Sequence, residues 1–380
     1  MGKQLLVAID PGFDSIKVIA NGQHFKFPFN AVQTDERKMS DYGSRSGFIL
    51  YKDQSGATWR VGQYARGLIY DNKTQDDEGS ELSNFYTEER FVSSEFTVGI
   101  RSAIAMAIDK TGLYNDQADL EISMIVALPH AIRTKYASTI IGLVAGEHNY
   151  LMTFDKGEER PYRYTILEQR VFTVSQTIAA ILGETSDDFG NVNEEKFFYL
   201  SNGPTLVVDG GYYTVGLVPV SRGGNVDDEK AESDTLHAMK NVNVATAKVI
   251  QDKRPDIKHY MIEYLMEQND GIIRYLNQKE GKAETINIEE IRQQKMHETC
   301  ADFIDHLNKK YNNLLDFRYV LITGGTGACY YAQMLDYYQG IGVTDSDHML
   351  LTKPTLNGEE TSIEFAIAVG AYKGLCGKLQ

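Results

Sequence analysis

Short apolar runs, each followed by an acid and a turn, occur once in each half of the chain. LLVAI at 5–9 and TLVV at 205–208 are wholly apolar apart from Thr205, and each leads through Asp into a second run of β-branched character. Runs of this length are typical of buried strands, because a helix needs a longer segment with a period near 3.6 residues. The pattern predicts the same β-hairpin twice, at 5–19 and 205–218.

The rest of the pattern predicts alternating strands and helices. Residues 225–312 are predicted to be mainly helical, and Asn287 with Glu290 is typical of a capped helix start. Strands interleaved with helices indicate an α/β fold. Further strands are predicted at 23–29, 120–129, 148–155, 161–169 and 319–322, a hairpin at 47–65, and a helix at 93–112.

Length and charge narrow the classes of protein. The 380 residues exceed one compact core, so two domains are expected. The formal net charge is −15, and Lys and Arg are scattered among acids, which repels phosphate backbones and anionic lipid heads. We therefore expect no direct nucleic-acid partner and no membrane partner, and any contact with DNA to require an adaptor.

Cysteine spacing and the distribution of apolar residues bear on the compartment. Cys300, Cys329 and Cys376 show neither metal-binding nor disulfide spacing, which fits a reducing compartment. Asp10 interrupts the first apolar run, so no signal-peptide core is expected, and nowhere do ~20 apolar residues run together. The expected location is cytoplasmic.

Both predicted hairpins carry the same turn. Asp10-Pro-Gly-Phe-Asp-Ser and Asp209-Gly-Gly-Tyr-Tyr-Thr each read acid, any residue, glycine, aromatic, any residue, hydroxyl. Glycine allows a tight backbone bend that other residues resist. Two matched copies so far apart along the chain indicate two similar domains, with one copy in each.

The two turns carry candidate chemistry. A bend of glycine and small hydroxyl residues points several backbone N–H groups at one spot, which suits phosphate oxygens. Asp10 and Asp209 would repel bare phosphate, so we interpret them as holders of Mg²⁺ through its water shell. Lys17, absent from the second copy, supplies a point charge for the phosphates. The candidate phosphate-binding residues are Gly12, Phe13, Asp14, Ser15 and Lys17 in the first turn, and Gly210, Gly211, Tyr212, Tyr213 and Thr214 in the second.

A third glycine cluster, Thr323-Gly-Gly-Thr-Gly, follows the strand predicted at 319–322 and precedes a segment with helical periodicity. This order lets the backbone approach a nucleotide, aided by the helix dipole. The cluster matches neither GxGxxG nor GxxxxGK[ST], so neither a Rossmann nor a P-loop site is indicated. The candidate nucleotide contacts are Gly324, Gly325, Thr326 and Gly327.

These elements, in this order, resemble the signature of the actin, sugar-kinase and heat-shock-chaperone superfamily. DPGFDSIK at 10–17 resembles its first phosphate loop, DGGYYT at 209–214 its second, and TGGTG at 323–327 its adenosine loop. RVFTVSQTIAAIL at 170–182 and SIEFAIAVGAYKGL at 362–375 resemble its two connecting helices. The resemblance implies an actin-like fold: two duplicated ribonuclease-H-like domains with a nucleotide cleft, each with a small subdomain.

The resemblance also implies domain boundaries. Domain I comprises residues 1–182 and 362–380, with its small subdomain at about 32–92. Domain II comprises residues 183–361, with its small subdomain at about 225–312.

Within this superfamily the chain is most similar to the ParM/Alp group of bacterial actin-like proteins. There is no room for the further substrate domain of a chaperone, and no membrane-inserting element of the MreB type is evident. In the ParM group an acid in the first connecting helix positions the attacking water. Gln176 stands in that place here, as a Gln does in eukaryotic actin, and can orient water without acting as a base.

What the resemblance implies is a nucleoside triphosphatase. ATP or GTP would bind with Mg²⁺, and Gln176, Asp209 and Asp10 would be the catalytic residues. Slow hydrolysis would be coupled to polymerisation, as in other filament-forming members of the superfamily.

Two functions follow from the resemblance. The first is a filament that segregates plasmid or phage DNA, with further copies of the chain and a DNA-binding adaptor as partners. The alternative is a small-molecule kinase of the sugar- or acetate-kinase branch, which commonly needs an Asp base in the first domain. VALPHAIR at 126–133 offers His130 in that region instead of Asp, so the filament is favoured.

Overall fold

The computed structural model describes residues 3–34, 48–63, 65, 88–155, 157–221, 225–269, 271–277 and 280–380. The chain forms two compact units. Unit 1 comprises Met1–Phe197 and Lys353–Gln380, and unit 2 comprises Phe198–Thr352. The domain boundaries expected from the sequence stay a prediction.

The first sheet of unit 1 contains the predicted N-terminal hairpin. Its strand order is β10-β7-β1-β2-β3, in which β1, β2 and β3 are antiparallel neighbours and β7 and β10 run parallel to β1. The hairpin is confirmed, with Asp10 opposite Lys17 across β1 and β2. The strands are β1 (Gln4–Pro11), β2 (Ser15–Ala20), β3 (Gln23–Pro28), β7 (Glu121–Leu128) and β10 (Val171–Ser175).

A second sheet of unit 1 is antiparallel throughout, with the order β4-β6-β5-β8-β9. The hairpin predicted at 47–65 is confirmed as β5 and β6, and β5 also pairs with β8. The small subdomain predicted at 32–92 lies partly outside the described residues, at 35–47, 64 and 66–87. The strands are β4 (Ala31–Thr34), β5 (Ile49–Lys52), β6 (Thr58–Val61), β8 (Gly146–Phe154) and β9 (Arg160–Ile166).

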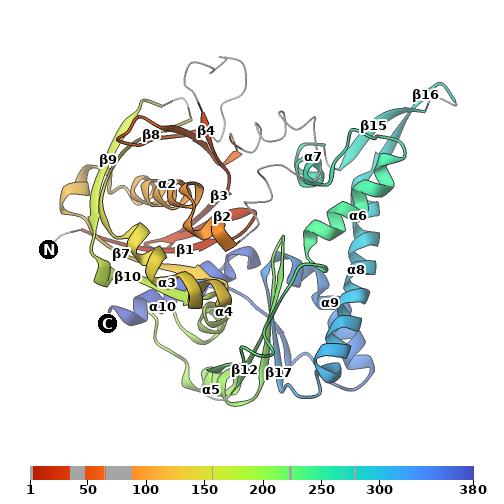
Figure 1. The fold of residues 1–380 in the computed structure, drawn as a ribbon. Coiled ribbons are helices and arrows are strands. Elements are labelled where there is room, and N and C mark those ends of the chain that lie inside the picture. The colour runs from red at the N-terminus through yellow and green to blue at the C-terminus, as the bar shows by residue number, and fades with distance from the viewer. Residues whose placement is uncertain are drawn as a thin grey trace. The chain divides into compact units, whose positions relative to one another are not determined.

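Helix α2 (Ser94–Lys110) lies between these two sheets (Figure 1). Its N-cap Ser93 accepts a hydrogen bond from Phe96 N, as the capping of a helix start requires. Most of its side chains are buried, because both sheets bury their inner faces against it. The predicted helix at 93–112 is thus confirmed as the centre of the unit 1 core.

Helices α4 (Gln176–Thr185) and α10 (Ala366–Lys378) pack against each other at very short range. A Cβ on Gly370 would lie 1.7 Å from the carbonyl oxygen of Ala179, so only glycine fits. Further elements of unit 1 include α3 (His130–Val144), the short helix η3 (Glu88–Val92), and the hairpin of β19 (Thr355–Leu356) and β20 (Glu359–Glu360); α5 (Glu194–Asn202) spans the unit boundary.

One prediction about unit 1 is wrong in detail. The segment 170–182 does not form one helix, because Val171–Ser175 is strand β10 and the helix begins at Gln176. Val171 and Val174 are buried in parallel pairing with β7, and β-branched residues suit that environment. Gln176 is therefore the first residue of a helix.

Unit 2 contains the second copy of the hairpin. Strands β11 and β12 are antiparallel, and β17 runs parallel to β11, so the arrangement repeats that of β1, β2 and β7. The main strand order is β13-β12-β11-β17-β18, and β14 pairs with β12. The strands are β11 (Thr205–Gly210), β12 (Val215–Ser221), β13 (Asn225–Val226), β14 (Glu232–Asp234), β17 (Tyr319–Thr323) and β18 (Met349–Leu351).

Residues 225–312 are less helical than predicted. Helices α6 (Met239–Gln251), α7 (Ile262–Asn269) and α8 (Ile288–Lys310) are present, but β15 (Ile272–Asn277) and β16 (Lys282–Asn287) form a hairpin between them. Ile273 pairs with Ile286 across this hairpin and both are buried. Asn287 caps α8 as predicted, since its side chain accepts from the Glu289 and Glu290 N–H groups.

The last helix of unit 2, α9 (Gly324–Gly340), follows β17 directly. In Figure 1, α8 and α9 lie on the same side of the unit 2 sheet, and the β15–β16 hairpin extends beyond one end of α8. Across the described ranges, no helix is long and apolar enough to cross a lipid bilayer.

Candidate functional site

The first turn places Asp10 and Lys17 side by side in unit 1. Asp10 is 3% exposed at the end of β1, and its Oδ2 lies 3.5 Å from Lys17 Nζ. A Cβ on Gly12 would come within 2.9 Å of the same Nζ, so the ammonium group lies over this glycine. The turn thus presents a cation beside an acid and a backbone without side-chain bulk.

Gln176 joins the same turn from another element. Its Nε2 donates to Asp10 Oδ1 at 2.9 Å. Ser175 caps the helix through an Oγ bond from Ile178 N, and this fixes where the helix starts. Because β10 and β1 both run parallel to β7, their carboxyl ends meet at one edge of the sheet. Asp10 and Lys17 of the first turn and Gln176 of a separate segment therefore lie together.

The other first-turn candidates of this unit are Phe13, Asp14 and Ser15. Phe13 packs its ring edge-on against Phe91, with the ring centroids 6.5 Å apart, and Asp14 O accepts from Phe29 N at 3.0 Å. Ser15 is buried at the start of β2. These contacts fix the position of the turn within unit 1.

Arg90 is a residue of this turn that the sequence pattern does not mark. Its Nη2 donates to the carbonyl oxygens of Pro11 at 2.8 Å and Gly12 at 2.7 Å. The guanidinium carbon lies 4.2 Å from the ring centroid of Phe13. Its hydrogen bonds to the turn go to backbone atoms, so no sequence motif indicates the contact.

The second turn packs against the third glycine cluster within unit 2. Gly211 N donates to Thr214 O at 2.9 Å, which closes the turn after Asp209. Thr326 Oγ1 donates to Gly211 O at 2.7 Å, and a Cβ on Gly210 would lie 2.1 Å from Gly327 N. Two motifs predicted separately thus form one surface.

The helix start at Gly324 depends on glycine. Gly324 has φ +76°, and a Cβ there would lie 2.5 Å from Gly210 O and 3.0 Å from Asp209 Oδ1. The N-cap Thr323 makes no side-chain cap hydrogen bond to α9. The first N–H groups of a helix lack partners within the helix and favour an anion. A Cβ on Gly325 would meet open space, so close packing does not require glycine at this position.

Side chains from α6 hold the second turn. Lys240 N donates to Tyr212 O at 2.8 Å, and Lys240 Nζ donates to the Tyr213 hydroxyl at 2.7 Å. Asn243 Nδ2 lies 3.4 Å from the Tyr212 hydroxyl, and Asn243 Oδ1 accepts from Arg292 Nε at 3.1 Å. The sequence does not predict Lys240, Asn243 or Arg292, because residues on separate helices share no motif with the turn.

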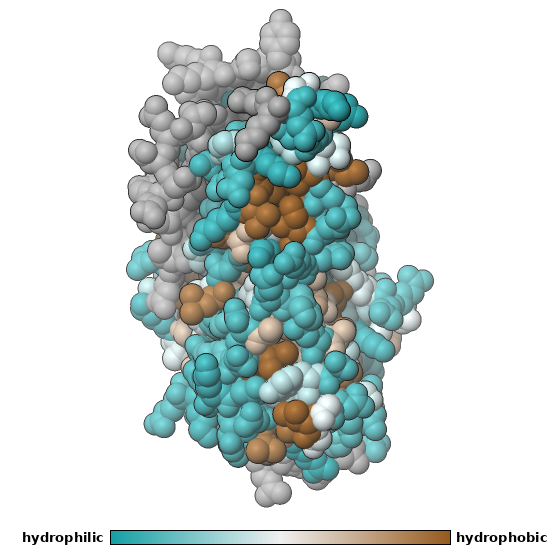
Figure 2. Space-filling model, turned by 90° about the vertical axis from the view of Figure 1, so that its right-hand side faces the viewer, coloured by the Kyte–Doolittle hydropathy of each residue, from teal (hydrophilic) through white to brown (hydrophobic). Residues whose placement is uncertain are grey.

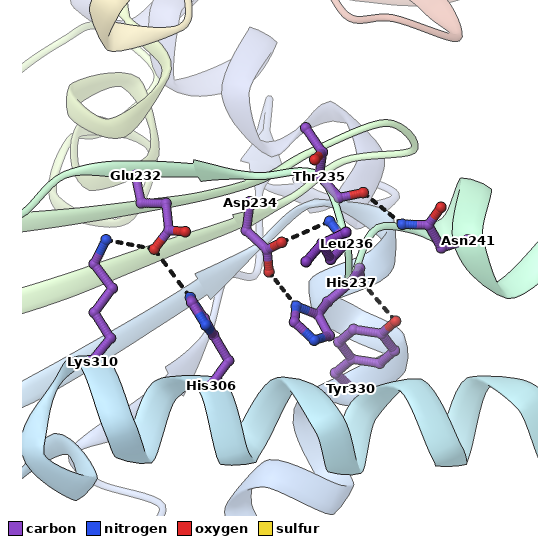
Figure 3. Close-up of polar contacts among 9 residues, drawn as sticks. All are labelled: Glu232, Asp234, Thr235, Leu236, His237, Asn241, His306, Lys310 and Tyr330. Atoms are coloured by element: carbon purple, nitrogen blue, oxygen red, sulfur yellow. Dashed lines mark hydrogen bonds and ion pairs between the residues drawn. The ribbon is translucent and has the colours of Figure 1, made fainter.

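A charged cluster lies between β14 and α8 (Figure 3). Asp234 Oδ2 lies 2.5 Å from His237 Nδ1, and Glu232 Oε2 lies 3.0 Å from His306 Nε2 and 2.5 Å from Lys310 Nζ. Burial alone would raise the pKa of Asp234, but hydrogen bonds from His237 and Leu236 outweigh burial and lower it. The pKa of Glu232 is lowered in the same way by Lys310 and His306.

This cluster is tied to the elements that carry the second turn. The Tyr330 hydroxyl of α9 donates to His237 O at 2.9 Å, and His237 lies just before α6 (Figure 3). The cluster therefore links β14, α6, α8 and α9.

The carboxylates of the turns fit Mg²⁺ only as an ion held through its water shell. In the described ranges, no group of three or more His, Cys, Asp or Glu side chains could hold a metal ion. The first turn carries Asp10 and Asp14, the second carries Asp209, and Asp10 is already engaged by Lys17 and Gln176. Mg²⁺ keeps several waters and binds through few carboxylates beside phosphate oxygens, so this donor set fits an ion held through water.

Comparisons with known proteins define the class of fold. No protein-family model and no curated protein matches the chain. Solved structures of actin-like proteins match over nearly the whole chain. The protein therefore has the actin-like fold, as the sequence predicts.

Three of the matching structures show the extent of the likeness. Alp7A has a TM-score of 0.68 at 12% identity, covering 99% of this chain and 97% of that one. A 15-stranded ParM filament from Clostridium botulinum has a TM-score of 0.67 at 17% identity, covering all of both chains. Bacillus thuringiensis ParM with ADP has a TM-score of 0.61 at 14% identity, covering 99% of each.

Proposed function

We propose that this chain is a nucleoside triphosphatase of the ParM/Alp group that assembles into filaments. The observation that carries the proposal is the contact of Asp10 with both Lys17 and Gln176 in unit 1. An acid, a phosphate-directed cation and a water-orienting amide are the parts that phosphoryl transfer to water requires. The repeat of the turn in unit 2 adds a second loop of the same kind.

The proposed ligand is ATP, or GTP, with Mg²⁺. The likeness to Bacillus thuringiensis ParM with ADP and with AMPPNP supports a purine nucleotide. The N–H groups of both turns would bind the phosphates, Lys17 would add a positive charge, and the glycine cluster at the start of α9 would contact the adenosine.

Gln176 is proposed to orient the attacking water. Its amide nitrogen is fixed by the 2.9 Å bond to Asp10, so its amide oxygen has a defined direction in which to accept from water. Glutamine takes up no proton, so it lacks the contribution of a general base. Mg²⁺ bound near Asp10 and Asp209 would neutralise phosphate charge. Because Gln176 supplies no general base, hydrolysis is expected to be slow even with Mg²⁺ bound.

The filament part of the proposal rests on the likeness to a ParM filament. Figure 2 shows one face of the molecule as mostly hydrophilic, with hydrophobic residues in separate groups. Ile272 and Leu276 on β15 are 49% and 64% exposed, and a contact with a further copy could bury them. The net charge of −15 supports a DNA-binding adaptor as the link to plasmid or phage DNA.

Phosphate release from ATP by wild type and Gln176→Ala tests this function. We expect slow release by wild type and about tenfold or more slower release by the variant, because water loses its orienting group. Gln169→Ala, an exposed glutamine of the same unit, is the matched control and should leave the rate unchanged.

Three results would count against the proposal. Equal rates in wild type and Gln176→Ala would remove Gln176 from catalysis. No release by wild type would reject the triphosphatase. Stoichiometric transfer of phosphate to a small metabolite would favour the kinase alternative.

A further inference from the structure

The underside of the first turn is held by a buried arginine. Arg90 in η3 is 5% exposed, and one of its nitrogens, Nη2, donates to two successive carbonyl oxygens of the turn. The distances are 2.8 Å to Pro11 O and 2.7 Å to Gly12 O, both within the range of strong charge-assisted hydrogen bonds.

Peptide geometry gives this contact a consequence on the opposite face of the turn. A trans peptide is planar, so its C=O and the following N–H point in opposite directions. No described peptide bond is cis. Because the guanidinium draws the carbonyls of Pro11 and Gly12 toward itself, the N–H groups of Gly12 and Phe13 point away from it. Successive N–H groups aimed the same way form an anion-binding concavity.

The position of Lys17 fits the same geometry. Its Nζ lies 2.9 Å from the place where a Cβ of Gly12 would stand. An anion contacting the Gly12 N–H would therefore lie close to the Lys17 ammonium group. Arg90 contacts the turn by hydrogen bonds to its carbonyl oxygens. Lys17 contacts it by placing its ammonium group against Gly12.

Aromatic rings fix the arginine itself. The guanidinium carbon lies 4.2 Å from the Phe13 ring centroid, 4.4 Å from that of Phe29 and 4.9 Å from that of Phe91. Cation–π contacts of this length favour a charged guanidinium in a buried place. Gly99 of α2 leaves room for Phe29, since a Cβ there would lie 2.6 Å from the Phe29 ring. The arginine is thus held rigidly beneath the turn.

We propose that Arg90 is a positioning residue for phosphate binding: it orients the first turn so that the Gly12 and Phe13 N–H groups face the phosphate chain of the nucleotide. The inference rests on the proposed function. Arg90 acts through the backbone and touches no reacting atom. Its role is to make the turn ready for an anion before the nucleotide arrives.

The test compares ATP with adenosine, which lacks phosphates, by calorimetric titration of wild type, Arg90→Met and Arg90→Lys. Arg90→Met keeps an apolar stem but loses the two hydrogen bonds to the turn and the charge. We expect it to weaken ATP binding about ten- to hundredfold and to leave adenosine binding unchanged. Arg90→Lys keeps a donor and should recover part of the loss.

Arg101→Met is the matched control. Arg101 lies in the same unit and donates through Nη1 to the Tyr51 hydroxyl at 2.8 Å, away from the turn. It should keep the wild-type ratio of ATP to adenosine affinity even where the melting temperature falls. A merely structural role for Arg90 would make the two arginine variants behave alike.

Each outcome decides the inference. An unchanged ratio of ATP affinity to adenosine affinity in Arg90→Met overturns the inference, whether both affinities stay the same or both fall equally. If Arg90→Met does not fold, the ratio is read in Arg90→Gln, where an unchanged ratio again overturns it. Failure of wild type to bind ATP at all rejects the proposed function, and the inference falls with it.

Discussion

Two buried carboxylates, those of Asp10 and Asp234, accept hydrogen bonds that hold their charge in place. Asp10 accepts from Gln176 and lies beside Lys17, and these contacts belong to the candidate site. Asp234 accepts from Leu236 N at 2.7 Å and from His237 Nδ1 at 2.5 Å. A buried carboxylate that accepts such bonds is stabilised in its ionised form.

We expect low pH to decrease the stability of unit 2, because Asp234 is then protonated. Its pKa is lowered in the folded state, so its contribution to stability is present above the unfolded pKa near 4 and is lost as pH falls through the folded pKa. We expect Asp234→Asn to lower the free energy of unfolding at about pH 6 and to differ less from wild type at about pH 3. Denaturant melts at both pH values measure this difference.

Asp345→Asn is the matched control, because it disrupts another Asp–His pair with the same separation along the chain. Asp345 pairs with His348 three residues on at 2.6 Å, but both side chains are exposed, so solvent screens the pair. Its effect should be smaller at every pH. An Asp234→Asn effect that does not change with pH would contradict the account.

The sequence predicts site residues where a motif marks them and misses them where no motif does. Asp10, Lys17 and Gln176 each belong to a motif, and the structure brings them together. Arg90 and Lys240 belong to none. Arg90 binds backbone carbonyls of a turn far from it in sequence, and such contacts leave no pattern in residue types.

At the level of elements, glycines allow several close approaches of one backbone to another. In unit 2, β11 and the start of α9 meet at Gly210 and Gly327, and in unit 1, α4 and α10 meet at Gly370. Each contact lets two elements approach more closely than any side chain permits. The second turn and the third glycine cluster depend on the first of these contacts.

Gly210→Ala should separate the second turn from α9. Its Cβ would lie 2.1 Å from Gly327 N, a backbone atom that cannot rotate away. We expect a loss of about 1–3 kcal/mol or more in unfolding free energy, the usual scale for overpacking. Gly216→Ala in the same hairpin is the control, since the nearest atom to its Cβ would be Asp209 Cβ at 3.7 Å. Similar melts for the two variants would refute the packing argument.

The apolar pattern predicts elements best where it is continuous. The hairpins at 5–19 and 205–218 and the helix at 93–112 are present, since burial on both sides leaves little choice of structure. The pattern misses the hairpin β15–β16 because its outer face is exposed and its sequence mixes charges with apolar residues. The family resemblance, not the apolar pattern, places a helix over strand β10, because these five residues directly precede the helix that begins at Gln176.

At the level of the whole molecule, the duplication is the organising feature. Each unit has an antiparallel hairpin beside a parallel strand, and each hairpin has the same order of acid, turn and second strand. The likeness to Alp7A and to a ParM filament extends over nearly the whole chain. Nucleotide-dependent self-assembly is the central claim that we propose from the fold and the first turn together.

Electron microscopy of the protein with Mg²⁺ and ATP tests this claim most directly. Wild type and Lys26→Ala should form filaments with ATP and none without nucleotide. Lys17→Ala should form none, because it loses the cation beside Gly12; Lys26, paired with Lys17 across the strands, is its matched control. Absence of any polymer of wild type with ATP or GTP, across salt and protein concentration, would contradict the account.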